Sequence, residues 1–393
     1  MTSMTSIRLH TLHIRPNGAL FTVEDPHSGD FYEMPPICID AIHMLEEGMP
    51  LNRIEEVLRR KYPEEEVDMT SFVEQLMEFG LVKEMDGRKI ERTETGTAGE
   101  GQLSWIPVRF ARLVFNRITQ TLFGFLFAAN IALLIAFPGL FPRYTDWFVF
   151  PSMTANMLVW MAVSLLLLLF HELGHFLAVR AEGLPARIGI GYRLFFIVLE
   201  TEMNGIWGLP KRRRFLPLLA GLCFDHFVLF SILVWKLSAH DLTGTASGLL
   251  TIVIYAVILN MMFQCLFFMK TDLYYVLEQA TGNSLLLENS RNWLSGFIPF
   301  MRSKDGAVLY PGEQKAVKWY GVFYAAGLFV SGAILIVYLL PQLFVATVNS
   351  FRQLKEPAGS IFFWDGVVFL AQLVLFAGLF VYARRKESRA RGG

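Results

Sequence analysis

Residues 153–179 read MTANMLVWMAVSLLLLLFHELGHFLAV. The stretch is apolar as far as Phe170, and as a whole it exceeds the roughly 20 residues that a helix needs to cross a bilayer. Directly after Phe170 come His171, Glu172 and His175. Ionisable side chains at membrane depth are costly and serve a function by default. The stretch therefore predicts a membrane-spanning helix that carries a functional site.

The composition of the whole chain agrees with a membrane protein. Its 393 residues are 53% hydrophobic and 18% charged, with a mean hydropathy of +0.41, whereas soluble domains are about 45–50% apolar and about 25% charged. This excess of apolar residues excludes a disordered chain. The 35 Lys and Arg balance the 35 Asp and Glu, so no basic surplus favours nucleic acid as a partner. Cys38, Cys223 and Cys265 form no metal-type CxxC pair.

Long apolar stretches alternate with short polar loops from about residue 114 onward. Six of them have the length of a membrane span, and they lie near residues 117–138, 153–179, 215–237, 247–269, 318–341 and 361–383. Most Lys and Arg of the loops fall on one side of these spans, for example in the run Lys211–Arg214. Because such loops stay in the cytoplasm, the sequence predicts a multi-pass protein of the cell membrane with both termini cytoplasmic.

The N-terminal residues predict a small α/β domain of the winged-helix type. Apolar and polar residues alternate from Leu9 to Val23 around a hairpin-type turn at Pro16-Asn17-Gly18. Three helical patterns and a short strand follow, over residues 37–48, 51–60, 69–79 and 81–83. The predicted architecture is mainly α, with this winged-helix-like domain at 1–85, a flexible Gly- and Thr-rich tether at 86–106, and a six-span membrane domain at 107–393.

Residues 171–175 read HELGH, which is an HExxH motif. His171 and His175 are one helical turn apart, so both imidazoles can reach one zinc ion. Glu172 lies beside them and can accept a proton from an attacking water. Two histidines bonded to neighbouring carbonyl groups are the structural alternative.

A catalytic zinc site needs three protein ligands and one open position. No third histidine is convincing, but a carboxylate can serve instead. Asp272, at the end of the fourth predicted span, falls on the cytoplasmic side, where the predicted topology also places HELGH. Asp225-His226 in the third span is the rival source of a ligand, and a polar pair near the membrane interface is the simpler interpretation of it.

With these residues in place, the chain resembles the site-2-protease family of intramembrane zinc metalloproteases over about residues 115–340. Besides HELGH, the matching stretches are Trp207–Arg212, Leu219–Gly221 and Asp272 followed by Tyr274-Tyr275. The resemblance implies that His171, His175 and Asp272 bind zinc and that Glu172 activates water. The chain departs from the family where Leu273 replaces the Gly that normally follows the aspartate, which puts the local backbone turn in question. It departs again where Asp225-His226 stands in place of a common asparagine.

The N-terminal pattern resembles the PqqD-like family, whose members hold the leader of a ribosomally made peptide. The matching pieces are Asn17-Gly18, Ser28-Gly29, Glu47-Gly48 and Phe79–Val82. The resemblance implies that a peptide adds a strand to the edge of the sheet. A generic winged helix that binds another partner is the alternative.

Residues 187–203 are rich in β-branched and aromatic side chains, but Gly189, Gly191 and Glu200 interrupt them too often for a span. They predict a re-entrant or interfacial hairpin close to HELGH, which in the resembled family lines the substrate. Packing against the helices is the alternative. Residues 285–311 predict a cytoplasmic loop.

The predicted function is that of a zinc endopeptidase that cuts a peptide or a membrane-associated precursor at the cytoplasmic side of the bilayer. The two resemblances favour maturation of a ribosomally synthesised, modified peptide whose leader is held by residues 1–85. Regulated cleavage of a signalling protein is the second substrate class. A membrane protein that binds its peptide without cutting it, such as an immunity protein, is the alternative, and the intact Glu172 speaks against it. A transporter or a di-iron oxygenase fits less well, because the chain shows one histidine motif and no internal repeat.

Overall fold

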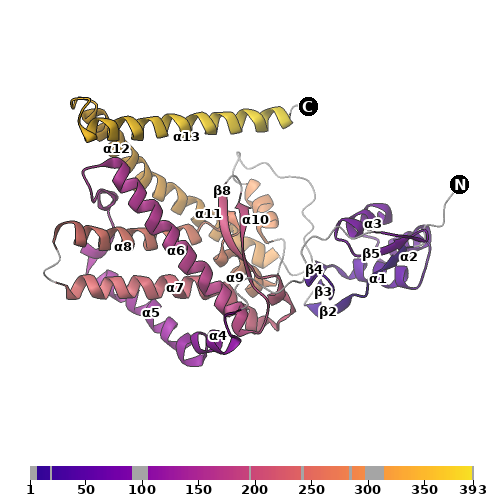
Figure 1. Ribbon diagram of the computed structural model, residues 1–393. Helices are drawn as coiled ribbons and strands as arrows, with labels where there is room; N and C mark the ends of the chain where they lie inside the picture. The colour runs from indigo at the N-terminus through magenta and orange to yellow at the C-terminus, as the bar shows by residue number, and fades with distance from the viewer. Residues whose placement is uncertain are drawn as a thin grey trace. The chain divides into compact units, whose positions relative to one another are not determined.

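The computed structural model describes residues 7–17, 20–90, 105–193, 196–239, 243–282, 286–296 and 314–391 (Figure 1). These residues form a mainly helical protein with an N-terminal region of small β-sheets and helices, as the sequence predicts. They pack into two compact units. Unit 1 comprises Met1–Leu113, Ala178–Gly189 and Glu200–Pro217, and unit 2 comprises Val114–Leu177, Ile190–Leu199 and Leu218–Gly393.

The N-terminal part of unit 1 contains the predicted hairpin, helices and closing strand. An antiparallel sheet joins strands β2 (His13–Asn17), β3 (Leu20–Asp25) and β4 (Asp30–Met34). Three helices follow, namely α1 (Pro36–Glu46), α2 (Leu51–Lys61) and α3 (Met69–Glu78). A second antiparallel sheet has the order β1 (Ile7–Leu9), β5 (Val82–Met85) and β6 (Arg88–Lys89). The predictions for these elements are confirmed.

The alternation of side chains gives the β2–β3–β4 sheet two different faces. On one face Ile14, Val23 and Tyr32 lie in register and pack into the apolar core that the helices complete. Val23 at the centre of this row is fully buried. On the other face His13 lies opposite Glu24, which in turn lies opposite Phe31. The sheet therefore covers the core with one face and presents a mixed polar and aromatic face on the other.

Six helices in the described part of the chain are long and apolar enough to cross a membrane. They are α5 (Arg117–Ala136), α6 (Met153–Ala181), α7 (Lys211–Ser238), α8 (Gly244–Gln264), the continuous helical segment Gln314–Gln353, and Ile361–Tyr382 within α13 (Ile361–Arg391). Large apolar side chains such as Leu166 and Phe329 are exposed on these helices, as expected where lipid replaces water around the protein. The prediction of six spans and a multi-pass membrane protein is confirmed.

The fourth span ends earlier than predicted. Helix α8 stops at Gln264 rather than near residue 269, and a short 3₁₀ helix, η4 (Phe267–Met269), follows. Lys270 then adopts a left-handed conformation with φ 52°, which no α-helix accepts. Helix α9 (Asp272–Thr281) begins directly after this turn. Asp272 is therefore not the last residue of the fourth span but the first residue of the next helix.

The fifth span is longer than predicted. Helix α11 (Gln314–Ala333) continues through a π-helical turn, η5 (Ile334–Leu339), into α12 (Leu340–Gln353). Pro341, where the predicted span ends, lies in the first turn of α12. Proline lacks an N–H group and normally interrupts a helix, but the wider π turn before it accommodates the missing hydrogen bond.

The loops contain several shorter elements. These are α4 (Val108–Val114), the 3₁₀ helices η1 (Pro138–Leu140), η2 (Tyr144–Trp147) and η3 (Asn204–Gly208), strands β7 (Arg187–Arg193) and β8 (Phe196–Glu202), and α10 (Leu286–Ser295). Strands β7 and β8 pair in a two-stranded sheet, which confirms a hairpin in the predicted 187–203 segment. The predicted loop over 285–311 contains α10, and residues 285 and 297–311 of that segment lie outside the described residues.

The predicted tether lies mostly outside the described residues. Residues 91–104 belong to that part, so the tether stays a prediction. The preceding residues 86–89 are ordered into the β5–β6 hairpin, with Asp86 and Gly87 at its turn. The assigned start at residue 86 is therefore too early.

Candidate metal centre

Three predicted ligands, far apart in the sequence, meet inside unit 2. His171 and His175 lie on α6, and Asp272 begins α9. The Nε2 atom of His171 is 3.0 Å from Oδ2 of Asp272, and Nε2 of His175 is 3.3 Å from the same oxygen. The two Nε2 atoms are 3.1 Å apart. The structure therefore brings together the three side chains that the sequence predicts as a set.

The distances between these atoms suit three ligands of one small metal ion. Bonds of about 2.0–2.1 Å to a central ion place two ligand atoms roughly 3.3 Å apart, close to the three distances observed. All three side chains are buried, with His175 only 2% exposed. Burial of so many polar atoms is costly unless they are neutralised by a partner. The donor set and its spacing fit a small divalent cation.

Asp225 on α7 fixes the orientation of His171. Its Oδ2 atom is 2.8 Å from Nδ1 of His171, and the carboxylate is 2% exposed. Because a carboxylate accepts a hydrogen bond, Nδ1 carries a proton, and in the neutral imidazole the lone pair then lies on Nε2, which faces Asp272 and His175. Two imidazole nitrogens and a carboxylate oxygen then converge, and a cation among them removes the repulsion of their lone pairs. A carboxylate behind a metal-binding histidine is a recurrent arrangement in metal sites.

Gln264 at the end of α8 holds Asp272 from two sides. Its side-chain amide donates to Oδ2 of Asp272 over 2.9 Å, and its carbonyl oxygen accepts from the backbone N–H of Asp272 over 3.1 Å. Burial alone would raise the pKa of the Asp272 carboxyl, but His175 and His171 hold that pKa well below its usual range. Asp272 is therefore present as the charged carboxylate, the form that binds metal ions.

The backbone turn before Asp272 is made at Lys270 rather than after the aspartate. Lys270 has φ 52° and ψ 52°, a conformation that costs a non-glycine residue of the order of 1 kcal/mol or more. Its ammonium group contacts Glu288 over 3.1 Å and lies 5.9 Å from the ring centroid of Tyr274. The turn that Leu273 put in question is thus supplied at Lys270, three residues earlier, and these contacts of the Lys270 side chain support it.

Glycines let the backbone of α7 approach the histidines. A Cβ atom built on Gly221 lies 2.3 Å from Nε2 of His171 and 2.4 Å from Nε2 of His175. A side chain at this position would collide with both ligand nitrogens, so a glycine is required where α7 passes the cluster. A Cβ atom built on Gly174 lies 2.6 Å from the carbonyl oxygen of Ala220. The two glycines therefore let α6 and α7 pack closely together beside the cluster.

The remaining predicted site residues take different positions. Glu172, the predicted catalytic base, is buried on α6 with 6% of its surface exposed. His226, the rival ligand, faces α5, where its Nδ1 atom is 3.2 Å from Nδ2 of Asn130 and its ring meets Phe127 edge to face. Asp225 reaches the histidines and is more than the interfacial polar group that the simpler interpretation assumed. It contacts His171 on the side opposite Asp272.

Sequence reasoning did not assign a role to Gln264, Gly221 or Lys270. Gly221 belongs to the stretch Leu219–Gly221 that matches the resembled family, so the sequence marks this position. The close approach of α7 to the histidines, which explains the glycine, is visible only in the structure. Gln264 and Lys270 can take their roles because α8 ends at Gln264, earlier than predicted. The apolar composition of the sequence does not show where this helix ends.

Comparison of the chain with protein-family models, curated proteins and solved structures finds no match. The fold and the site therefore define the class directly. The chain is a multi-pass membrane protein with a buried His-His-Asp cluster that can hold a metal ion.

Proposed function

We propose that this membrane protein is an intramembrane zinc endopeptidase of the site-2-protease type. The observation that carries the proposal is the convergence of two Nε2 atoms and one carboxylate oxygen at 3.0–3.3 Å, beside the buried Glu172 of an HExxH motif. Two histidines, one carboxylate and a neighbouring glutamate are the groups that zinc peptidases use for metal binding and proton transfer.

The residues of the chain divide the chemistry among them. His171, His175 and Asp272 would hold a zinc ion, which would supply Lewis acidity toward a peptide carbonyl. Glu172 accepts the proton of the attacking water and returns it to the leaving amine. Asp225 and Gln264 hold His171 and Asp272 in place. The apolar surroundings limit the access of bulk water, which strengthens each of these electrostatic interactions.

The proposed substrate is a ribosomally synthesised, modified peptide, or another membrane-associated precursor, cut at the cytoplasmic side. The asymmetry of Lys and Arg in the loops supports this side, and with it cytoplasmic termini. The β2–β3–β4 sheet supports leader recognition, since β2 is an edge strand to which an extended peptide can add. Pro16 within β2 agrees with an edge position, because a proline has no N–H to give to a further neighbour.

Metal analysis of the purified full chain tests the site. We expect about one zinc ion per chain in the wild type and close to none in His171→Ala or Asp272→Ala. His226→Ala is the matched control, because this histidine lies in a neighbouring span and bonds Asn130 instead of the cluster. Equal zinc in wild type and His171→Ala would refute the metal centre, and loss of zinc in all variants including the control would point to misfolding.

Cleavage assays test the reaction separately from metal binding. Glu172→Gln is expected to keep the zinc and to lose processing of the precursor in cells, because the variant cannot accept a proton. Processing that survives in Glu172→Gln would exclude the peptidase and favour a protein that only binds its peptide. Deletion of residues 1–85 is expected to slow processing of the native substrate and to leave the zinc content unchanged. Equal rates with and without these residues would remove their recognition role.

A further inference from the structure

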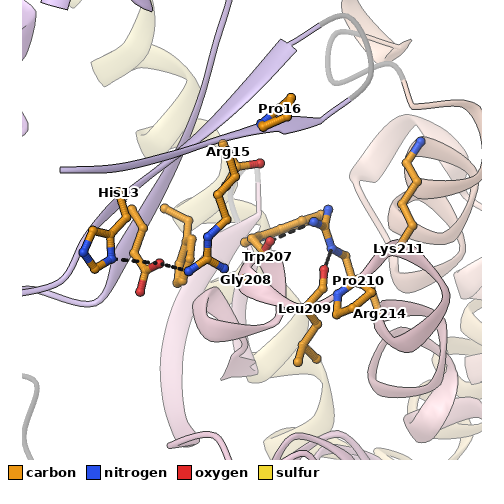
Figure 2. Close-up of a pocket in the computed structure, with 12 residues that line it drawn as sticks. His13, Arg15, Pro16, Trp207, Gly208, Leu209, Pro210, Lys211 and Arg214 are labelled. Carbon is orange, nitrogen blue, oxygen red and sulfur yellow. Dashed lines mark hydrogen bonds and ion pairs between the residues drawn. The ribbon is translucent and has the colours of Figure 1, made fainter. Parts of the chain in front are cut away.

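Unit 1 contains a pocket of about 310 Å³ that the proposed peptidase chemistry does not use. One wall is the outer face of the β2–β3–β4 sheet. The other wall is the segment Trp207–Arg214, which runs from the end of η3 into the first turn of α7 (Figure 2). The pocket therefore lies where a folded sheet meets the beginning of a membrane-spanning helix.

The two walls are in direct contact at a glycine. A Cβ atom built on Gly208 lies 3.0 Å from the ring of Phe31, which projects from β4. A larger residue at position 208 has to displace this ring. On the sheet wall Arg15 and His13 both approach Glu24, at 3.2 Å and 3.7 Å. This wall therefore combines an aromatic ring with a partly neutralised cationic edge.

Arg214 gives the second wall a fixed shape. It donates to the carbonyl oxygens of Leu209 over 2.7 Å and of Trp207 over 2.8 Å, and its guanidinium carbon is 5.5 Å from the ring centroid of Trp207. The side chain is buried, with the residue 6% exposed. Figure 2 shows it directed back at these residues, whereas the Lys211 side chain extends away from them. The loop is thus held in one conformation with a cation beneath it.

The charge of the pocket favours an anion. Arg15, Lys211 and Arg214 line it against a single carboxylate, that of Glu24. The carboxylate of Glu24 already contacts Arg15 and His13, and the negative charge of Glu33 on β4 attracts the guanidinium group of Arg214. Lys211 is exposed and makes no ion pair with any residue that the structure describes. The ammonium group of Lys211 can therefore contact a negative ligand, and the positive charges of Arg15 and Arg214 add to the attraction.

The length of α7 places this pocket at the level of lipid headgroups. The helix has 28 residues, which corresponds to about 42 Å at about 1.5 Å per residue, whereas the hydrocarbon core measures about 30 Å. Roughly two turns therefore lie beyond the core. The run Lys211–Arg214 occupies the first turn, and Trp207 precedes it. Tryptophan and clustered basic residues are enriched at this depth.

We propose that this pocket binds the phosphate group of an anionic membrane lipid. Lys211 and Arg15 contact the phosphate from the two walls, Arg214 adds its charge from below, and the apolar surfaces of Trp207 and Leu209 accommodate the glycerol region. Because the ligand touches both walls, anionic lipid strengthens the packing of the sheet on the segment Trp207–Arg214. The proposal does not depend on the peptidase activity.

Native mass spectrometry of the full chain released from lipid nanodiscs tests this site. The discs contain phosphatidylcholine alone or phosphatidylcholine mixed with phosphatidylglycerol. We expect the wild type to retain phosphatidylglycerol selectively, and Lys211→Gln or Arg15→Gln to weaken this retention by about fivefold each, as expected for the loss of one cation near a membrane surface. Arg212→Gln and Arg8→Gln are the matched controls, since each removes one positive charge from a residue outside the pocket.

If the control variants lose phosphatidylglycerol retention as much as the pocket variants do, the lipid is held only by general surface attraction, and the proposal is overturned. Equal retention of both lipids by the wild type would also overturn it. Two further measurements separate the sources of a negative charge. If inorganic phosphate stabilises the wild type as strongly as the lipid does, and does not stabilise Lys211→Gln, the pocket is a site for a free anion. A soluble polyglutamate peptide that displaces the lipid from the wild type would assign it to an acidic peptide. Both results contradict a lipid site. Lys211 and Arg15 are exposed, so neither variant is expected to unfold.

Discussion

Helix α6 has a buried aspartate from another helix near each of its ends, and the two carboxylates meet opposite kinds of partner. At the N-terminus Asp365 of α13 accepts from the backbone N–H groups of Met153 and Thr154 over 2.8 Å and 3.0 Å, from the Ser152 hydroxyl over 2.7 Å and from the Gln353 amide over 2.9 Å. Near the other end Asp272 faces the Nε2 atoms of two histidines.

This comparison distinguishes an aspartate that stabilises the start of a helix from an aspartate that can bind a metal ion. Every partner of Asp365 named above is a hydrogen-bond donor, so the negative charge is satisfied without any further group. Asp225 accepts a hydrogen bond from the far nitrogen of His171, so in the neutral imidazole the nitrogen that faces Asp272 offers a lone pair. Asp365 is surrounded by donors and caps a helix, whereas Asp272 receives one hydrogen bond from the Gln264 amide and also faces two imidazole nitrogens that can bind a cation with it.

The largest effect is expected from Gly221→Ala. The added methyl carbon collides with the Nε2 atoms of both histidines and displaces them, so we expect zinc to fall from about one per chain to near zero and cleavage to be lost. Gly332→Ala is the control, because a Cβ atom at Gly332 meets nothing within 4 Å. Metal analysis of both variants decides the point, and normal zinc in Gly221→Ala would show that the ion does not lie between the two histidines.

Asp365→Ala is expected to destabilise the protein by about 3 kcal/mol, because it leaves buried N–H groups at the start of α6 without an acceptor. Thermal unfolding in detergent measures the loss. The zinc content of the folded protein is expected to stay at the wild-type level, in contrast with Asp272→Ala. A variant of normal stability that lost its zinc would contradict the division between the two carboxylates.

Asp225→Asn refines the comparison at the chemical end. Asparagine keeps a hydrogen-bond acceptor for His171 but removes the charge, so we expect zinc affinity to fall by about 10–100-fold while zinc still binds. Competition with a chelator measures this affinity. His226→Gln, at the next position, is expected to leave it unchanged. An affinity for Asp225→Asn equal to that of the wild type would mean that the carboxylate does not act on the metal through His171.

The smallest effect is expected for Asp40, a carboxylate surrounded by donors outside the membrane. Burial tends to raise its pKa, but Lys61 over 2.5 Å and Tyr62 over 2.6 Å lower it below its usual value. Because the folded pKa is the lower one, the stabilisation is complete above the unfolded pKa of about 3.9 and is lost as the pH falls through the folded pKa.

Amide exchange in α1 and α2 measures this contribution, which is small because water screens the pair. Protection is expected to decline below about pH 4 in the wild type and to show no such step in Asp40→Asn. Glu56→Gln, which removes an exposed pair with Arg60, is the control. An identical decline in Asp40→Asn would assign the pH dependence to other groups.

The sequence predicts most of the architecture because lipid imposes strong rules on it. Apolar length alone locates six spans, and the HExxH spacing selects His171 and His175. Asp272 follows from its predicted side of the membrane and from the family resemblance. The end of α8 could not be predicted, since Lys270 adopts its left-handed turn through contacts with Glu288 and Tyr274 that form only in the folded chain. The approach of Gly221 to the histidines depends in the same way on how α6 and α7 pack.

The hydrogen bonds between Asp365 and the start of α6 also determine when this helix can be completed during biosynthesis. Met153 and Asp365 are 212 positions apart, and they belong to the second and the last span. At about 5–20 residues per second, the ribosome needs roughly 10–40 s to reach the aspartate after it has passed the start of α6. During that interval the helix that bears HELGH is already made, but its N-terminal amides lack their final acceptor. The second span therefore reaches its finished form only when the last one has been synthesised and inserted.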